Sequence, residues 1–428
     1  MDYAESVAYL DAHIGQGVKP GLERIENLLE FMGRPDQGYP IIHVAGTNGK
    51  TSTVRLATIL LVAHGLTTGT YTSPHLQDIE ERLSVNGRNS TREEFALAMS
   101  DVKAFADLRE KRGSDPNTYF ELTTAAAFAF FADQAVNAAV LEVGLGGRLD
   151  ATNVVEADVC VVTSIGVDHT EYLGEDIESI AREKLAIAGP GSILVTGPLP
   201  EEAMGVATET AKTLGIQHRR YDMDYRIGEA ERGVGGWLAT IEGAEDVYED
   251  VFLPLHGKHQ VTNLAVAIAS AEALVGHRLD SDAVKDAASA ATSPGRMEPM
   301  MSNPLVMIDG AHNADGIAVL VDSLNEEFPS TKWHVVLGVM GDKNIDLMVE
   351  RLKPILAGVV TTAVEHERAV APRDLAAKVA TLVEVPVLHS DSVEHAVDMA
   401  RAEAGSDGAV LVAGSLYLVG EVREIFST

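Results

Sequence analysis

The sequence has one cysteine in 428 residues. Cys160 lies in an apolar run, so it can form no internal disulfide, and we interpret it as a packing residue rather than a nucleophile. Long hydrophobic runs are also lacking, because stretches such as 56–63 and 125–132 are too short to span a bilayer. The first residues are acidic and do not have the basic-then-apolar order of a signal peptide. These absences predict a cytoplasmic protein.

Basic residues are scarce. Lys and Arg number 33 against 64 Asp and Glu, which gives a formal net charge of −31. This balance argues against nucleic acid or an anionic membrane as a partner. It does not exclude anionic small molecules, since a few basic side chains can be concentrated in one site. We therefore expect small-molecule substrates, with a monomer as the default state.

The segment 40–53, PIIHVAGTNGKTST, has the order of a phosphate-binding loop. A short apolar strand leads into a turn, and the turn opens into a segment compatible with a helix. Backbone N–H groups and the helix N-terminus would converge on an anion, and Lys50 would reach the outer phosphates. The spacing GTNGKT is two residues shorter than the common loop, so a glycine-containing turn with a surface lysine is the alternative. The predicted nucleotide-binding residues here are Gly46, Thr47, Asn48, Gly49, Lys50, Thr51 and Ser52.

The chain predicts an α/β fold in two domains. Residues 1–39 have helical spacing, and strand-like and helix-like segments then alternate, which favours a mostly parallel sheet covered by helices. Short runs with glycines over 221–255 predict a small antiparallel patch. The alternation restarts after the segment SPGR at 293–296. We therefore predict a domain over 1–293 that carries the phosphate loop, and a smaller Rossmann-like α/β domain over 294–428.

Polar residues follow three of the predicted strands. Ser73, Glu142 and His169 each lie shortly after an apolar run, and ligands of open α/β sheets bind at the carboxyl ends of strands. Any one of them alone is more often a cap or a solvated side chain. Together, near a phosphate loop, they predict ligands for one or two Mg²⁺ ions. Lys184, by contrast, has the pattern of an exposed helix lysine.

An ordered set of motifs resembles folylpolyglutamate synthase and dihydrofolate synthase, members of the wider Mur ligase superfamily. The resemblance runs from about residue 3 to the C-terminus, and its specificity lies in the order of the set. The motifs are GTNGKTS (46–52), TSPHL (72–76), ERLSVNG (81–87), FELTT (120–124), EVGLGGRLDATN (142–153), DHTEYLG (168–174), HGKHQVTN (256–263), SPGRMEPM (293–300), DGAHN (309–313) and GSLYLVGEVR (414–423).

The resemblance implies an ATP-dependent ligation of L-glutamate. In this family MgATP phosphorylates a carboxylate of dihydropteroate or of a folate, and the glutamate amine attacks the acyl phosphate. The products are dihydrofolate or folylpolyglutamates, with ADP and phosphate. The segment GGRLDATN is similar to the pterin-binding segment of bifunctional bacterial enzymes, so we expect both activities. Folylpolyglutamate synthase activity alone is the alternative within the family.

The resemblance also implies roles for single residues. Lys50, His169 and Lys184 are expected at the catalytic centre, with Lys184 carbamylated and helping to hold a second metal. Thr51, Ser73, Glu142 and His169 are the expected Mg²⁺ ligands, and ATP contacts are also expected from Asn263, Arg296, Asp309 and His312. The acceptor is expected near His75, Phe120, Asp150 and Ala151.

Four positions depart from the commonest family pattern. Thr51 stands where folate enzymes usually have glycine, which leaves open whether Thr51 or Ser52 supplies the metal-binding hydroxyl. Leu185-Ala186 replaces Ala-Gly, Ala314 replaces a proline, and Asn344 replaces an aspartate. None of these changes removes a proposed ligand.

Two other functions fit part of the pattern. A Mur-type ligase of UDP-linked muramyl chains would carry a whole N-terminal domain for the UDP group, and about 40 residues before the loop are too few for one. A nucleotide switch or binding protein would use the loop without ligation. It leaves the SPGRM segment, the DGAHN segment and the second α/β domain unexplained.

Overall fold

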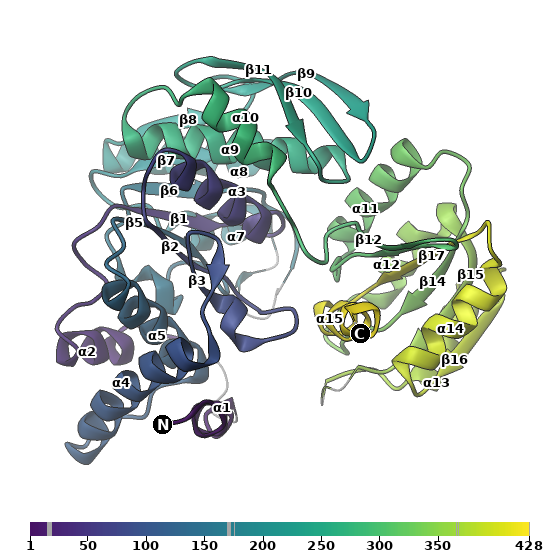
Figure 1. Cartoon of the computed structure of the whole chain (residues 1–428), viewed down its shortest axis with the longest axis horizontal. Helices are drawn as coiled ribbons and strands as arrows, with labels where there is room; N and C mark the ends of the chain where they lie inside the picture. The colour runs from purple at the N-terminus through teal and green to yellow at the C-terminus, as the bar shows by residue number, and fades with distance from the viewer. Residues whose placement is uncertain (15–18, 169–172, 175, 365, 367, 428) are drawn as a thin grey trace. The chain divides into compact units, whose positions relative to one another are not determined.

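The computed structural model describes the chain apart from residues 15–18, 169–172, 175, 365, 367 and 428. The chain forms two compact units (Figure 1). The larger unit contains residues 1–231, 238–253 and 261–291, and the smaller unit contains 232–237, 254–260 and 292–428. In the part of the chain that is described, no helix is both long and apolar enough to cross a membrane.

An eight-stranded sheet forms the centre of the larger unit. Its strands lie in the order β4-β3-β2-β5-β1-β6-β7-β8, and neighbours are parallel from β2 to β8 and antiparallel from β2 to β4. The predicted mostly parallel sheet is thus confirmed. The strands are β1 Ile41–Ala45, β2 Thr68–Tyr71, β3 Leu83–Val85, β4 Arg88–Asn89, β5 Ala138–Glu142, β6 Val159–Val162, β7 Ile193–Thr196 and β8 Gln217–Arg220.

Helices cover both faces of this sheet, and every residue of β1 is buried. Successive side chains of a strand point to opposite faces, so Ile41, His43 and Ala45 share one face. Ile41 packs in a core cluster with α1, α2, α4 and α5, and Ala45 packs in a second cluster that includes Cys160. The helices are α1 Tyr3–Asp11, α2 Glu23–Phe31, α3 Lys50–Ala63, α4 Arg92–Lys111, α5 Tyr119–Asp133, α7 Ile177–Leu185, α8 Glu201–Leu214, α9 Lys258–Val275 and α10 Ser281–Ser289, with short 3₁₀ helices η2 Ile79–Arg82 and η3 Ala151–Val154.

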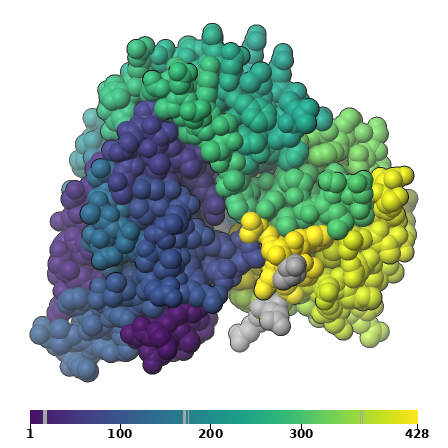
Figure 2. All heavy atoms as spheres, viewed as in Figure 1, coloured from purple at the N-terminus to yellow at the C-terminus, as the bar shows by residue number. Residues whose placement is uncertain are grey.

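Local sequence explains where several of these helices begin. α4 and α5 each start with a capping box, in which Thr91 pairs with Glu94 and Thr118 pairs with Glu121. α4 lies at the surface of the larger unit (Figure 2). Cys160 is buried, and burial raises the pKa of its thiol to about 12, which agrees with a packing role.

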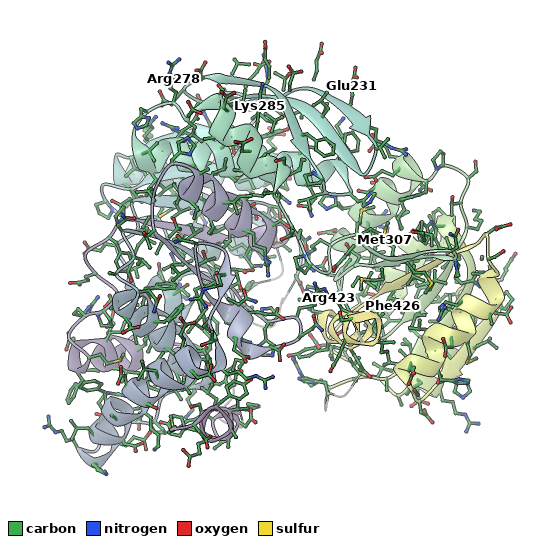
Figure 3. All side chains as sticks on the ribbon, viewed as in Figure 1. Glu231, Arg278, Lys285, Met307, Arg423 and Phe426 are labelled. Carbon is green, nitrogen blue, oxygen red and sulfur yellow. The ribbon has the colours of Figure 1, made fainter. Side chains whose placement is uncertain are left out.

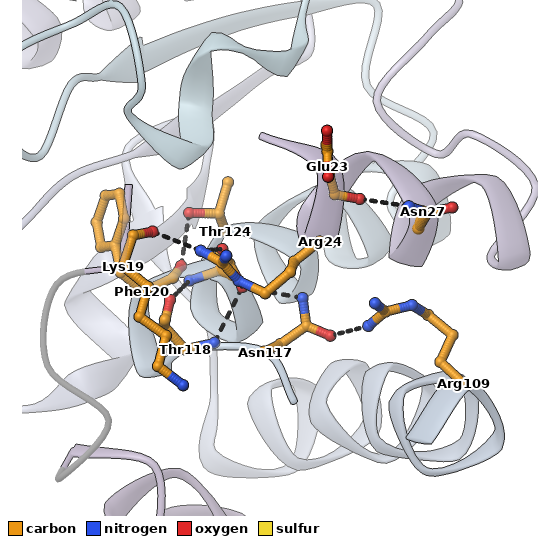
Figure 4. A network of polar contacts seen from close by, with 10 residues as sticks. Lys19, Glu23, Arg24, Asn27, Arg109, Asn117, Thr118, Phe120 and Thr124 are labelled. Atoms are coloured by element: carbon orange, nitrogen blue, oxygen red, sulfur yellow. Dashed lines mark hydrogen bonds and ion pairs between the residues drawn. The ribbon is translucent and has the colours of Figure 1, made fainter. Parts of the chain in front are cut away.

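A polar network joins α2, α4 and α5 (Figure 4). The Glu121 carboxylate accepts hydrogen bonds from Arg24 Nη2 at 2.7 Å, from Asn117 Nδ2 at 3.0 Å and from the Thr118 backbone N–H at 3.0 Å. Asn117 Oδ1 in turn accepts from Arg109, a largely buried cation. The network fixes the start of α5, directly beside Phe120.

A three-stranded sheet, β11-β10-β9, lies where the sequence predicted a small patch. Its strands are β9 Arg226–Gly233, β10 Gly236–Glu242 and β11 Val247–Leu253. The buried carboxylate of Glu272 on α9 accepts hydrogen bonds from the Tyr248 hydroxyl at 2.8 Å and the Ala244 backbone N–H at 2.8 Å. Arg219 lies 3.7 Å from the same carboxylate. Glu272 therefore ties this sheet to α9 and to β8.

The smaller unit has a six-stranded sheet in the order β12-β13-β17-β14-β15-β16. β12 and β13 are antiparallel, and the other neighbours are parallel. Met307, labelled in Figure 3, is fully buried in a core with Trp333. The elements are β12 Glu298–Ser302, β13 Leu305–Ile308, α11 Ala314–Glu327, β14 Trp333–Leu337, α12 Ile345–Leu352, η4 Lys353–Ile355, β15 Leu356–Thr362, α13 Pro372–Ala380, β16 Val387–Ser390, α14 Val393–Ala404, β17 Ala409–Ala413 and α15 Leu416–Ser427.

We expect Glu272→Ala to lower the free energy of unfolding by about 3 kcal/mol, because the Tyr248 hydroxyl and the Ala244 N–H lose their acceptor and the nearby Arg219 loses a buried counter-charge. Urea denaturation measures the change. Glu249→Ala is the matched control, since Glu249 is exposed on β11. A loss below about 1 kcal/mol for Glu272→Ala would contradict the structural role given to this carboxylate.

Candidate active site

The loop between β1 and α3 has the strand–loop–helix context that the sequence predicted. Gly46 has φ 152° and Gly49 has φ 85°, both in the region that favours glycine. A Cβ on Gly46 would lie 2.0 Å from Thr163 Oγ1, and a Cβ on Gly49 would lie 2.7 Å from Asn263 Oδ1. Both glycines are therefore required by close neighbours as well as by backbone conformation.

Residues after β6 hold the loop in place. The Thr47 N–H donates to the Ser164 carbonyl at 2.9 Å, and the Asn48 N–H donates to Ser164 Oγ at 2.9 Å. Thr163 Oγ1 donates to the Asn48 carbonyl at 2.7 Å. Sequence reasoning did not single out Thr163 or Ser164. These residues could have been identified from the sequence, because they are two hydroxyl residues directly after an apolar strand-like run.

Two lysines converge on the backbone carbonyl of Gly46. Lys50 Nζ donates to it at 3.0 Å, and Lys184 Nζ donates to it at 3.0 Å. Lys184 is only 5% exposed, so the surface position predicted from its helical pattern is wrong. Burial, together with the nearby Lys50 charge, lowers the pKa of Lys184 to about 7. A fraction of Lys184 therefore carries a neutral, nucleophilic amine near neutral pH.

Oxygen atoms that could bind a metal ion lie near the Glu142 carboxylate at the end of β5. The Thr51 hydroxyl donates to Glu142 Oε1 at 2.8 Å, and the Ser73 N–H donates to Oε2 at 3.3 Å. Ser73 Oγ is buried with no partner among the described atoms. This group fits a hard cation such as Mg²⁺, which prefers oxygen ligands and would give the orphaned hydroxyl a partner. Thr51 contacts the carboxylate directly, which favours its hydroxyl over that of Ser52.

The fourth predicted ligand, His169, lies outside the described residues. Over the described ranges, no group of three His, Cys, Asp or Glu side chains is placed to hold a metal. The hydroxyl oxygens near the Glu142 carboxylate belong to Thr51 and Ser73, and a group defined by His, Cys, Asp and Glu side chains does not count hydroxyl groups. The predicted metal set therefore stays a prediction.

The residues predicted to meet the acceptor follow β2, β5 and the start of α5. Asp150 caps η3, which begins at Ala151, and its carboxylate accepts from the Leu145 N–H at 2.8 Å and the Thr152 N–H at 3.0 Å. A Cβ on Gly144 would lie 2.4 Å from the ring of Phe120. Gly144 thus allows the Phe120 ring to lie against the loop that carries Asp150.

The loop 73–78, which contains His75, is organised by the two residues Glu81 and Arg82. The Glu81 carboxylate accepts from the backbone N–H groups of Leu76 at 2.9 Å, Gln77 at 2.9 Å and Asp78 at 3.1 Å. Arg82 Nε donates to His75 Nδ1 at 2.9 Å. Burial and the Arg82 charge lower the pKa of His75 to about 4, so the ring is neutral. The ERLSVNG motif contained both residues, but the sequence did not show which groups they hold.

In the smaller unit, three predicted nucleotide contacts lie together. The Asp309 carboxylate accepts from the Met297 N–H at 2.9 Å and the Ala311 N–H at 2.8 Å. Arg296 lies against Gly310, where a Cβ would meet its Nη1 at 2.0 Å. Burial raises the pKa of Asp309, and the Arg296 charge opposes that shift.

His312 Nδ1 lies 2.9 Å from the Gly310 carbonyl. Asn263, by contrast, belongs to the larger unit and lies beside Gly49.

Two family models match this chain. The Mur ligase middle domain matches residues 44–271, and the Mur ligase glutamate ligase domain matches residues 295–416. A Mycobacterium tuberculosis protein named dihydrofolate synthase/folylpolyglutamate synthase is 36% identical over 440 residues, covering 96% of this chain and 90% of that protein. The chain belongs to the dihydrofolate synthase/folylpolyglutamate synthase family of Mur ligases.

Solved structures of this family share the fold. The M. tuberculosis folylpolyglutamate synthase complexed with ADP and AMPPCP has a TM-score of 0.95 and 36% identity, covering 100% of this chain and 99% of that chain. Escherichia coli FolC in complex with DHPP and ADP has a TM-score of 0.88 and 31% identity, covering 100% and 98%.

Another relative has a longer chain. A Haloferax volcanii protein named as a probable bifunctional folylpolyglutamate synthase/dihydropteroate synthase is 37% identical over 426 residues. The match covers 99% of this chain but only 50% of that protein. This member of the synthase family thus corresponds to about half of that relative.

We expect Gly46→Ala to destabilise the fold by about 1–3 kcal/mol, because the new methyl group would overlap Thr163 and the backbone would be strained. Chemical denaturation measures this loss. Gly189→Ala is the control, since a Cβ there meets nothing within 4 Å and no positive φ is involved. Equal stability of the two variants would show that the loop tolerates a Cβ at residue 46.

Proposed function

We propose that the protein is an ATP-dependent ligase that joins L-glutamate to dihydropteroate and to the γ-carboxylate of folates. The observation that carries the proposal is the phosphate loop with Glu142, Thr51 and Ser73 beside it, in a chain that matches a protein named dihydrofolate synthase/folylpolyglutamate synthase over 96% of its length. The ADP and AMPPCP complexes of the M. tuberculosis relative, and the DHPP and ADP complex of the E. coli relative, support the nucleotide and the acceptor.

The reaction transfers a phosphoryl group and then an acyl group. A carboxylate oxygen of the acceptor attacks the γ-phosphorus of ATP, and the bond to the ADP oxygen breaks. The glutamate amine then attacks the acyl phosphate carbon, loses a proton, and phosphate leaves. Neither step needs a side-chain nucleophile, so the protein's task is to place the substrates and stabilise charge.

The loop and its lysines perform the charge stabilisation. Backbone N–H groups of 46–52 would bind the phosphates, and Lys50 would turn from the Gly46 carbonyl to the transferring group. We keep Asn263, Arg296, Asp309 and His312 as proposed nucleotide contacts, as the family resemblance implies. We assign the ATP and acceptor sites to residues 1–293 and a glutamate ligase role to 294–428.

Thr51, Ser73 and Glu142 would hold Mg²⁺, with His169 as a further ligand. Mg²⁺ supplies Lewis-acid neutralisation of the phosphate oxygens when bound. Lys184 would contribute a carbamate oxygen to a second Mg²⁺. The support is its burial beside the loop and its low pKa, because a neutral amine reacts with CO₂ whereas an ammonium does not.

The acceptor would lie along Phe120, Asp150, Ala151 and His75. Phe120 offers an aromatic face, and Asp150 offers a carboxylate that is held by backbone donors. His75, with Nδ1 occupied by Arg82, would present Nε2–H as a donor. With small-molecule substrates of this kind, we propose a cytoplasmic monomer that needs neither nucleic acid nor a membrane.

We expect glutamyl products by mass spectrometry when the protein receives ATP, Mg²⁺ and L-glutamate with either dihydropteroate or tetrahydrofolate. Lys50→Ala should lower both rates roughly 10²- to 10³-fold, since it removes a cation from the transition state. Lys212→Ala, an exposed lysine on α8, is the control.

Addition to one acceptor only would reduce the proposal to that single activity. ATP consumption without any addition would show that the acceptor is not a folate. Near-normal rates for Lys50→Ala would remove the role given to this lysine.

We expect Lys184 to form a carbamate, visible as a ¹³C NMR signal after incubation with ¹³C-bicarbonate. The signal should grow as the pH rises from about 6 to 8, because the folded pKa of about 7 lies in this window and only the neutral amine reacts. Lys184→Ala should lack the signal. A wild-type spectrum identical to that of Lys184→Ala would rule out the modification.

A further inference from the structure

A chain of hydrogen bonds joins the strand before the phosphate loop to the proposed acceptor site. His43 Nε2 lies 2.8 Å from Thr152 Oγ1, and Thr152 Oγ1 lies 2.6 Å from Asp150 Oδ1. All three residues are buried, with exposures of 0%, 0% and 6%. His43 lies in β1, three residues before Gly46, whereas Thr152 and Asp150 follow β5. Neither His43 nor Thr152 has a role in the proposed reaction.

The direction of each hydrogen bond follows from the donors present. Asp150 Oδ1 also accepts the Thr152 backbone N–H at 3.0 Å, and Oδ2 accepts the Leu145 N–H at 2.8 Å. Burial raises the pKa of Asp150, and the N–H donors oppose that shift because they favour the ionised carboxylate. With the carboxylate as the acceptor, the single hydroxyl proton of Thr152 points to Asp150. The Thr152 oxygen must then accept from His43. His43 therefore carries its proton on Nε2.

The remaining nitrogen of His43 confirms a neutral ring. Nδ1 is buried and has no partner among the described atoms, so a proton there would be unsatisfied. Burial lowers the pKa of His43 to about 3, far below neutral pH. A neutral imidazole has one N–H, and that N–H is used on Thr152. The hydrogen bonds therefore run in one direction: His43 donates to Thr152, and Thr152 donates to Asp150.

We propose that His43 and Thr152 are positioning residues that hold Asp150 as a hydrogen-bond acceptor for the N–H edge of a pterin ring. The proposal rests on the acceptor contact given to Asp150 above. The hydrogen bonds from the Thr152 hydroxyl and from the Leu145 and Thr152 N–H groups fix the plane of this carboxylate. A carboxylate fixed in this way accepts from a ring that offers N–H groups, and it repels a ring that offers only acceptors.

Steady-state kinetics with each substrate varied in turn tests the proposal on the full chain. Thr152→Val keeps the shape but removes the hydroxyl, so the KM for dihydropteroate should rise about tenfold, while those for ATP and glutamate stay within about twofold. Thr152→Ser should restore the wild-type KM. Thr208→Val, on the surface of α8, is the control and should change nothing.

The histidine has its own matched pair of variants. His43→Gln can place an amide N–H where the imidazole Nε2 lies, whereas His43→Leu cannot donate. We expect His43→Gln to retain a near-normal KM for dihydropteroate and His43→Leu to show the Thr152→Val effect. In an Asp150→Asn background neither Thr152→Val nor His43→Leu should raise this KM further, because both act through the carboxylate.

A measurement on the wild-type protein tests the proposal even if the variants fail to fold. ¹⁵N NMR of the wild-type imidazoles should show His43 as a neutral ring protonated at Nε2. A ring protonated at Nδ1, an equal rise of all three KM values, or failure of Thr152→Ser to rescue would each overturn the proposal. If Asp150→Asn leaves the KM for dihydropteroate unchanged, the acceptor contact of the proposed function fails as well.

Discussion

The close approach of Gly46 to Thr163 is the constraint on which the site depends. Because residue 46 has no Cβ, the Thr163 hydroxyl can reach the loop and bind the Asn48 carbonyl. In this loop conformation, the Gly46 carbonyl accepts hydrogen bonds from both Lys50 Nζ and Lys184 Nζ. Two cations on one carbonyl disfavour each other's charge, which is one cause of the lowered Lys184 pKa. The backbone of one glycine thus sets both the loop geometry and the protonation of a buried amine.

Buried and half-buried carboxylates provide the second organising element of this acidic chain. Glu81, Glu121, Glu272 and Asp309 each accept backbone N–H groups and hold a loop or a helix start in one conformation. A carboxylate that accepts several donors is well solvated by the protein itself, so its burial is compatible with a stable fold. The same device recurs at Asp150, where it is tied to the proposed acceptor site. Net charge alone therefore does not describe what the acidic residues do.

Much of the architecture followed from local patterns. The strand–loop–helix unit at 40–63 was predictable because two glycines, an apolar strand and a helix-compatible segment have direct conformational meanings. Most central strands were visible as apolar runs, whereas β8 and β16 were not, since each lies at a sheet edge and carries polar or exposed residues. Lys184 shows the limit most clearly. Its helical pattern is that of a surface lysine, yet α7 places it beside the loop.

The sequence by itself determined the alternation of strands and helices, the glycine-containing loop at 46–52, and the family. Tertiary structure alone decided the pairings: Thr51 with Glu142, Lys184 with Gly46, and His43 with Thr152. These partners are separated by 91, 138 and 109 residues. Local patterns specify the backbone conformation of a few neighbouring residues. Contacts between residues so far apart in the sequence depend instead on which strands lie next to each other in the sheet. The sheet places β1 between β5 and β6, and that order brings these residues to one edge.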